Sequence, residues 1–186
     1  MPLGGRGLRA SVVGSSATRT PMPVSVLPET DQRLSVPLVW VPPLTERLLR
    51  LLHDRGDWAA VDARNLEEIV AEIFAQFGYT VELTSRTRDG GRDVVAVRHS
   101  NIKEDKYLIE CKHWQSRVDI SVVRELLGVG QVEPNSGLIL VSTSGFTKDA
   151  VVLSQREEVK WTLALRDREA IEAWIREYAR QRNWLT

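Results

Sequence analysis

Apolar residues recur at helical spacing in the segment 63–78. They form a wide stripe made of Leu66, Ile69, Val70, Ile73, Phe74 and Phe77. Gly78 is a suitable stop, and either Asn65, in a capping box, or Asp62 can cap the start. Glu67 falls on the edge of the stripe. The pattern predicts an amphipathic helix that packs on a core and carries Glu67 beside it.

A shorter amphipathic helix is predicted ahead of this one, after Pro42 and Pro43. Its apolar face consists of Leu48, Leu49 and Leu52. The preceding residues are rich in Gly, Ser, Thr and Pro, and we expect them to form a disordered tail. An organelle transit peptide is the alternative for this Arg- and Ser-rich start. We therefore expect three parts: a tail over 1–43, a short helical extension over 44–62 and the main domain over 63–186.

Runs of strand-forming residues and further helical patterns follow. The strand runs lie at 79–84, 93–98, 107–112, 137–142 and 160–165, and the helical patterns lie at 121–129, 147–158 and 167–182. Short polar segments separate the first three runs, as in an antiparallel meander. The fourth run is continuously apolar, as in a buried parallel strand. The order predicts an α/β fold with a mixed sheet of about five strands, antiparallel at one end and parallel at the other, flanked by helices on both faces.

The composition narrows the class of protein. A hydrophobic fraction of 42% and a charged fraction of 27% suit a soluble protein with a packed core. The formal net charge is zero, so any contact with nucleic acid must rest on local patches. One cysteine and three scattered histidines cannot assemble a usual zinc site, and a reducing, cytoplasmic setting fits. We expect no membrane span and, without a Walker-type glycine loop, no nucleotide cofactor.

Charged residues stand at the ends of two neighbouring strand runs. Glu110 and Lys112 project from the same face of their strand, and Cys111 points the other way. If residues 99–106 form the hairpin loop, Asp93 falls opposite the Glu110–Lys112 end. Carboxylates suit Mg²⁺, which usually takes one or two of them and leaves the other positions to water and substrate phosphate. The arrangement predicts metal-assisted hydrolysis of a phosphodiester.

The motifs together resemble the catalytic domain of Mrr-type restriction endonucleases, within the PD-(D/E)XK nuclease superfamily. The matching segments are Leu66 to Phe74, Phe77-Gly78-Tyr79, Asp89-Gly90-Gly91-Arg92-Asp93, Glu110-Cys111-Lys112 and Thr143 to Thr147. Many Mrr-type domains carry Gln where this chain has Glu110, so the site is more acidic and is also similar to that of archaeal Holliday-junction resolvases. Mrr-type enzymes often carry a winged-helix domain before the nuclease, and we expect the ordered stretch before residue 63 to be too short for one.

The resemblance implies a three-layer, restriction-endonuclease-like fold and a Mg²⁺ cofactor, for which Mn²⁺ could substitute. Asp93, Glu110, Glu67 and the backbone carbonyl of Cys111 would be the metal ligands. Lys112 would orient or help deprotonate the attacking water and offset charge on the phosphate. Asp89 is the weaker candidate ligand, since an Asp before Gly usually serves the turn. The expected catalytic residues are thus Glu67, Asp93, Glu110 and Lys112.

Polar residues around these motifs are candidates for contacts with DNA phosphates, which position a protein without reading sequence. They are Arg86, Arg88, Arg92, His113, Gln115, Arg117 and Arg124. Trp114 either packs internally or stacks on a base. Cutting both strands usually needs two active sites, so a homodimer is a reasonable hypothesis.

Three functions therefore compete at this level. The leading hypothesis is a Mg²⁺-dependent DNA endonuclease that restricts foreign or modified DNA. A Holliday-junction or repair nuclease with the same acids is the second. A DNA-binding module without catalysis is the third, and the intact Asp93, Glu110 and Lys112 argue against it.

Overall fold

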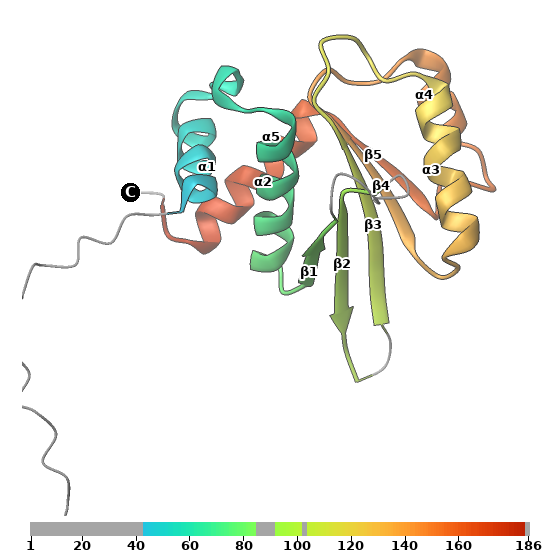
Figure 1. Ribbon diagram of the computed structural model, residues 1–186, viewed down its shortest axis with the longest axis horizontal. Helices are drawn as coiled ribbons and strands as arrows, with labels where there is room; N and C mark the ends of the chain where they lie inside the picture. The colour runs from blue at the N-terminus through green and yellow to red at the C-terminus, as the bar shows by residue number, and fades with distance from the viewer. Residues whose placement is uncertain (1–42, 85–91, 102–103, 185–186) are drawn as a thin grey trace, which may run out of the picture. The chain divides into compact units, whose positions relative to one another are not determined.

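A computed structural model of the chain describes residues 43–84, 92–101 and 104–184. Contacts divide the chain into residues 1–40 and 41–186, and all described residues belong to the second unit. The helices and strands follow in the order α1 Leu44–Arg55, a 3-10 turn Trp58–Ala60, α2 Ala63–Gln76, β1 Thr80–Leu83, β2 Val94–His99, β3 Glu104–Lys112, α3 Ile120–Val132, β4 Gly137–Ser142, α4 Lys148–Ser154, β5 Leu163–Arg166 and α5 Arg168–Gln181 (Figure 1). Among these helices none is long and apolar enough to cross a membrane.

The five strands form one mixed sheet in the order β1-β2-β3-β4-β5. The pairs β1–β2 and β2–β3 are antiparallel, and the pairs β3–β4 and β4–β5 are parallel. This confirms the predicted mixed sheet, because a short connection can only return the chain antiparallel, whereas the helices α3 and α4 supply the parallel crossovers. The central strand β3 is the junction between the two halves.

Helices cover both faces of the sheet (Figure 1). On one face, α1, α2 and α5 bury a core that includes Ile69, Ile109 and Ile175. On the other face, α3 and α4 bury a core that includes Leu108 and Leu126. Leu108 and Ile109 are neighbours on β3, and because successive side chains of a strand point to opposite faces, each contributes to a different core. A strand covered on both faces can bury polar side chains only where they have partners.

The start of α2 is fixed by a reciprocal cap. The Asp62 carboxylate accepts from the Asn65 backbone amide at 2.7 Å, and the Asn65 side chain accepts from the Asp62 amide at 3.2 Å. Asp62 is therefore the N-cap, which decides between the two candidates in the sequence. The helix it starts packs on the sheet and carries Glu67 and Glu72.

The last strand and the helix before it are shorter than their patterns predicted. The helix ends at Ser154, and hydrogen-bonded turns follow, with Lys160 N donating to Arg156 O at 2.9 Å. Strand β5 then starts at Leu163, where pairing with Leu138 begins. Trp161 is 85% exposed and belongs to the turn. The strand was predicted to include Trp161 because tryptophan favours strands, but pairing with β4 begins only at Leu163.

Candidate active site

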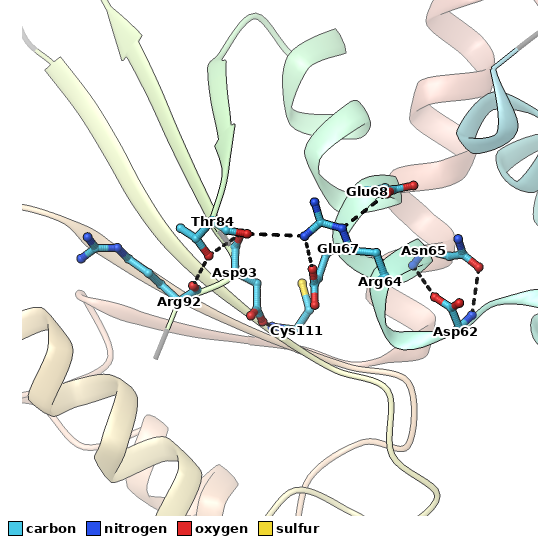
Figure 2. A network of polar contacts seen from close by, with 9 residues as sticks. All are labelled: Asp62, Arg64, Asn65, Glu67, Glu68, Thr84, Arg92, Asp93 and Cys111. Carbon is cyan, nitrogen blue, oxygen red and sulfur yellow. Dashed lines mark hydrogen bonds and ion pairs between the residues drawn. The ribbon is translucent and has the colours of Figure 1, made fainter. Parts of the chain in front are cut away.

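Asp93 stands at the entry to β2 and reaches across to β3. Its amide donates to Ile109 O at 2.9 Å, and its Oδ2 accepts from the Cys111 amide at 2.7 Å. Figure 2 shows the Asp93 carboxylate directed toward Cys111. The register Val94↔Ile109, continued by one residue, sets Asp93 opposite Glu110. The hairpin therefore brings Asp93 to the acidic end of β3, as predicted, although its strands extend further into the loop.

Glu110 is buried inside β3, with 5% of its surface exposed. Its Oε1 lies 2.6 Å from Lys112 Nζ, two residues further along the same strand. Its Oε2 is buried and has no hydrogen-bond partner among the described residues. A buried carboxylate oxygen without a partner costs about 1–3 kcal/mol. The fold therefore tolerates a polar atom that it does not itself satisfy.

Burial and nearby charges alter the acidity of this pair. Burial raises the pKa of Glu110, and the ion pair with Lys112 only partly offsets that effect. Burial also lowers the pKa of Lys112, but the bond to Glu110 and the charge of Asp93 outweigh it, so the net shift is upward. The two residues thus share a site in which the ammonium form of Lys112 is stabilised by the surrounding acids.

The alternation along β3 separates Cys111 from the charged residues. Cys111 belongs to the core under α1, α2 and α5. Leu108, which lies on the same face of β3 as Glu110 and Lys112, belongs to the core under α3 and α4. Burial raises the pKa of the Cys111 thiol well above its usual range. The thiol is a small core residue, as the alternation of the sequence predicted.

Glu67 approaches from the other layer. It lies on α2, and its carboxylate accepts from Arg64 at 2.7 Å, while Arg64 also reaches the Thr84 carbonyl at 3.5 Å (Figure 2). The negative charge of Glu67 contributes to the raised pKa of the Cys111 thiol. The structure therefore brings Asp93, Glu110 and Lys112 together and leaves Glu67 on the α2 side of the strand end.

The donor set suits a hard divalent cation in part. Among the described residues, no group of three or more acidic, His or Cys side chains is assembled at metal-binding distance. Asp93 and Glu110 supply two carboxylates, and Mg²⁺ needs only one or two besides water and substrate oxygens. The unpartnered Oε2 of Glu110 is the free acceptor that such a cation would use. The two residues fit Mg²⁺ with an incomplete protein ligand shell.

Glu125 on α3 is a further acid near the site. Its charge raises the pKa of both Glu110 and Lys112, and its side chain is exposed. We did not expect this residue at the site from the sequence. Its one signal was its place on the helix that follows the Glu110–Lys112 strand, next to the buried turn of Val122, Val123 and Leu126. A helical acid is too common for that signal to stand out.

The residues expected to contact DNA fall into three groups. Arg86 and Arg88, like the turn residue Asp89, lie outside the described residues. Arg92 forms an ion pair with Glu133, which also accepts from Lys106 at 2.7 Å. Four others are half-buried or exposed near the end of β3 and on α3, namely His113, Gln115, Arg117 and Arg124. The ion pair of Arg92 competes with any phosphate for its guanidinium.

Comparisons with known proteins agree with this architecture. The model of the Mrr_cat family, described as a restriction endonuclease, matches residues 58–175. The chain belongs to this family. A protein of Sinorhizobium fredii (strain NBRC 101917 / NGR234), named uncharacterized protein y4cE, is 37% identical over 112 residues. That match covers 58% of this Mrr_cat chain and only 28% of the relative, so the chain spans less than a third of its length.

A solved structure of a restriction endonuclease shares the fold of this Mrr_cat chain. The DNA modification-dependent restriction endonuclease AspBHI superposes with a TM-score of 0.52 at 17% identity, over 77% of this chain and 39% of that one. The MspJI restriction endonuclease in complex with a 27-mer oligonucleotide gives a TM-score of 0.48 at 19% identity, over 75% and 32% of the two chains. The family match confirms the resemblance seen in the motifs, and the AspBHI superposition confirms the fold.

Proposed function

We propose that this chain is a Mg²⁺-dependent endonuclease that hydrolyses phosphodiester bonds in DNA and serves to restrict foreign or modified DNA. The observation that carries the proposal is the state of Glu110, a buried carboxylate with one oxygen on Lys112 and the other without a partner among the described residues. Family membership supplies the reaction class. The proposal applies to this chain and to any larger protein of which it is a part.

The buried pair has no evident value for stability. Replacing a buried ion pair by well-packed apolar residues is often neutral or stabilising. Glu110 and Lys112 lie on a strand whose other inward positions, such as Leu108 and Ile109, are apolar and fully buried. A destabilising charge in such a place is typical of a functional site, where perturbed acidity and unsatisfied groups gather. This supports a catalytic rather than a purely structural role.

Each residue has a proposed task in hydrolysis. Asp93 and Glu110 hold the cation through their carboxylates, and the Cys111 carbonyl is the further oxygen that the family resemblance implies. When bound, Mg²⁺ polarises a phosphoryl oxygen and lowers the pKa of a water. Lys112, kept as an ammonium by the acids around it, stabilises negative charge that grows on the phosphate. Glu67, on α2, is the further carboxylate that the family resemblance implies for the site, and its charge acts on Cys111 together with those of Asp93 and Glu110.

The direct test is cleavage of supercoiled plasmid by the purified full chain. We expect nicked or linear product with Mg²⁺ or Mn²⁺, none with EDTA, and more product from modified than from unmodified plasmid. Asp93→Asn should abolish cleavage. Glu157→Gln is the control for the loss of one carboxylate charge, because Glu157 lies in an exposed turn, where it pairs with Lys160 at 2.7 Å.

Three results would overturn the proposal. Cleavage that persists in EDTA or in Asp93→Asn would remove the metal site from the reaction. Binding of DNA with no cleavage of any substrate would favour the non-catalytic DNA-binding module. Faster cleavage of four-way junctions than of modified duplex would instead favour the junction or repair nuclease with the same residues.

A further inference from the structure

A cleft of about 830 Å³ opens beside the candidate active site. Its walls come from the residues that follow β3, β4 and β5 and from the 3-10 turn after α1, and they include Trp58, His113, Trp114, Gln115, Thr143 and Arg168. Sites that bury drug-sized ligands have volumes of about 300–1,000 Å³. The cleft can therefore accommodate a group as large as a nucleotide.

Lys112 lies next to residues that line the cleft. His113, Trp114 and Gln115 follow Lys112 directly, and the Thr143 amide donates to Lys112 O at 3.2 Å. Lys112 Nζ lies 5.4 Å from the centroid of the Trp114 ring. A nucleic acid strand whose phosphate lies at Lys112 would therefore place its next nucleotide at the mouth of the cleft.

The polar groups of the cleft favour an anion. None of the described residues that line it is acidic. Arg168 is anchored by its Nε, which donates to Thr143 O at 3.1 Å, and its Cζ lies 5.6 Å from the centroid of the Trp58 ring. No bond to the terminal nitrogens of Arg168 is seen within the described part of the chain. A fixed guanidinium with two free terminal nitrogens is well suited to a phosphate.

The two tryptophans of the cleft differ in exposure. Trp58 is 7% exposed, and its Nε1 donates to Glu172 at 3.2 Å, so it is part of the framework. Trp114 is 45% exposed, which leaves much of its ring open to a ligand. An exposed indole beside a guanidinium and an imidazole is the combination that binds unpaired bases, since every base has a π face for stacking.

We propose that this cleft is a subsite for an unpaired nucleotide of the DNA strand, next to the bond that is cleaved, with Trp114 stacking on its base and Arg168 holding its phosphate. The inference rests on the proposed nuclease function, which supplies the DNA. It assigns a substrate class: DNA that is single-stranded, or that opens locally, beside the cleavage position. A fully paired duplex would leave the cleft empty.

The test measures binding of the full chain to fluorescein-labelled DNA in EDTA, by fluorescence anisotropy. The DNAs are a blunt duplex, the same duplex with a short single-stranded overhang, and that overhang built from abasic residues. We expect the overhang to bind more tightly than the blunt end, and the abasic overhang to lose that preference. Trp114→Ala should reduce the preference by about 5- to 150-fold, the range that corresponds to stacking of one base, whereas Trp114→Phe should keep most of it.

Two more variants complete the design. Arg168→Gln should weaken binding of the overhang. It tests the subsite independently if Trp114→Ala does not fold. Trp161→Ala should change nothing, and it is a close control because Trp161 is 85% exposed and has Lys160 Nζ 5.0 Å from its ring centroid, as Trp114 has Lys112. Unchanged preference in both Trp114→Ala and Arg168→Gln would overturn the proposal, and so would equal binding of the abasic and normal overhangs.

The outcome is separable from that of the nuclease proposal, because the binding measurement in EDTA does not require cleavage. A preference for the overhang that depends on Trp114, in a chain that never cuts DNA, would support the subsite and refute the nuclease. If the chain cleaves DNA but its preference for the overhang is unchanged in Trp114→Ala and Arg168→Gln, the nuclease proposal is supported and the subsite is refuted.

Discussion

Glu110 and Lys112 project from the same face of β3 and form an ion pair of 2.6 Å, with their side chains 6% and 23% exposed. The pair sits where the antiparallel and parallel halves of the sheet meet. Burial on this scale makes each charge depend on the other, since neither is fully hydrated. The pair thus couples the chemistry proposed for the site to the stability of the sheet.

Removal of Lys112 should leave Glu110 as a buried carboxylate without a counter-charge. We expect Lys112→Met to abolish cleavage and, in EDTA, to lower the free energy of unfolding by about 1–3 kcal/mol at neutral pH. The pKa of Glu110 is already raised in the folded chain and should rise further. The folded state then binds more protons than the unfolded state, so stability falls as pH rises between the two pKa values. Urea melts at about pH 5 and about pH 8 should show the larger penalty at the higher pH. If the loss of unfolding free energy does not vary with pH, the buried Glu110 carboxylate is not its cause.

Glu110→Gln should separate stability from activity. The substitution removes the desolvation cost of a buried carboxylate but takes the partner from the Lys112 ammonium, so the two effects oppose each other and the melting temperature in EDTA should change by no more than about 2–4 °C, which corresponds to about 1 kcal/mol. Cleavage should fall by about 100-fold or more, since even weaker changes around metal ligands cost 10- to 100-fold. Thermal melts and plasmid cleavage check both. A stable variant with full activity would remove Glu110 from the site.

The hydroxyl of Tyr178 ties α5 to α2. Tyr178 is fully buried, and its hydroxyl donates to Glu72 Oε1 at 2.8 Å. Burial and the bond to Glu72 raise the pKa of this hydroxyl, so it remains the donor throughout the physiological range. Tyr178→Phe should cost about 1.5–3 kcal/mol of unfolding free energy, as for bonds to charged groups. Denaturant melts measure this loss. Cleavage at low temperature should be unchanged, because the bond lies in the layer of α2 and α5.

Gly137 opens β4 against a ring of the central strand. A Cβ at this position would lie 2.6 Å from Tyr107 Cε1, which is too close without movement of the ring. Gly137→Ala should therefore destabilise the chain by about 1–3 kcal/mol, as overpacked cores do. Gly128 on α3 is the matched control, since a Cβ there meets nothing within 4 Å. Gly128→Ala should stabilise by about 0.5–1 kcal/mol through helix propensity. Denaturant melts of the two variants should move in opposite directions.

The parts of the site that local patterns govern could be predicted from the sequence. The two-residue repeat of a strand placed Glu110 and Lys112 on one face and Cys111 on the other, and a short hairpin brought Asp93 to them. Both inferences need only local geometry and one turn. They do not depend on how the rest of the chain packs.

Relationships between distant segments were not predictable. The ion pair between Arg92 and Glu133 joins the start of β2 to the end of α3, and no periodic pattern in the sequence predicts it. The same holds for the charge of Glu125 at Lys112. The cleft is assembled from four separate segments of the chain, so its residues carry no common spacing. Such features depend on which layer each helix covers, which is decided by packing of the whole sheet.

The amide of Cys111 donates to the side chain of Asp93. The chain contains a single cysteine. Labelling with ¹⁵N-cysteine would therefore give one backbone amide resonance, and that resonance reports on the Asp93 carboxylate. Titration with a divalent cation should shift it if Asp93 changes partners, so the fold carries its own spectroscopic probe of occupancy.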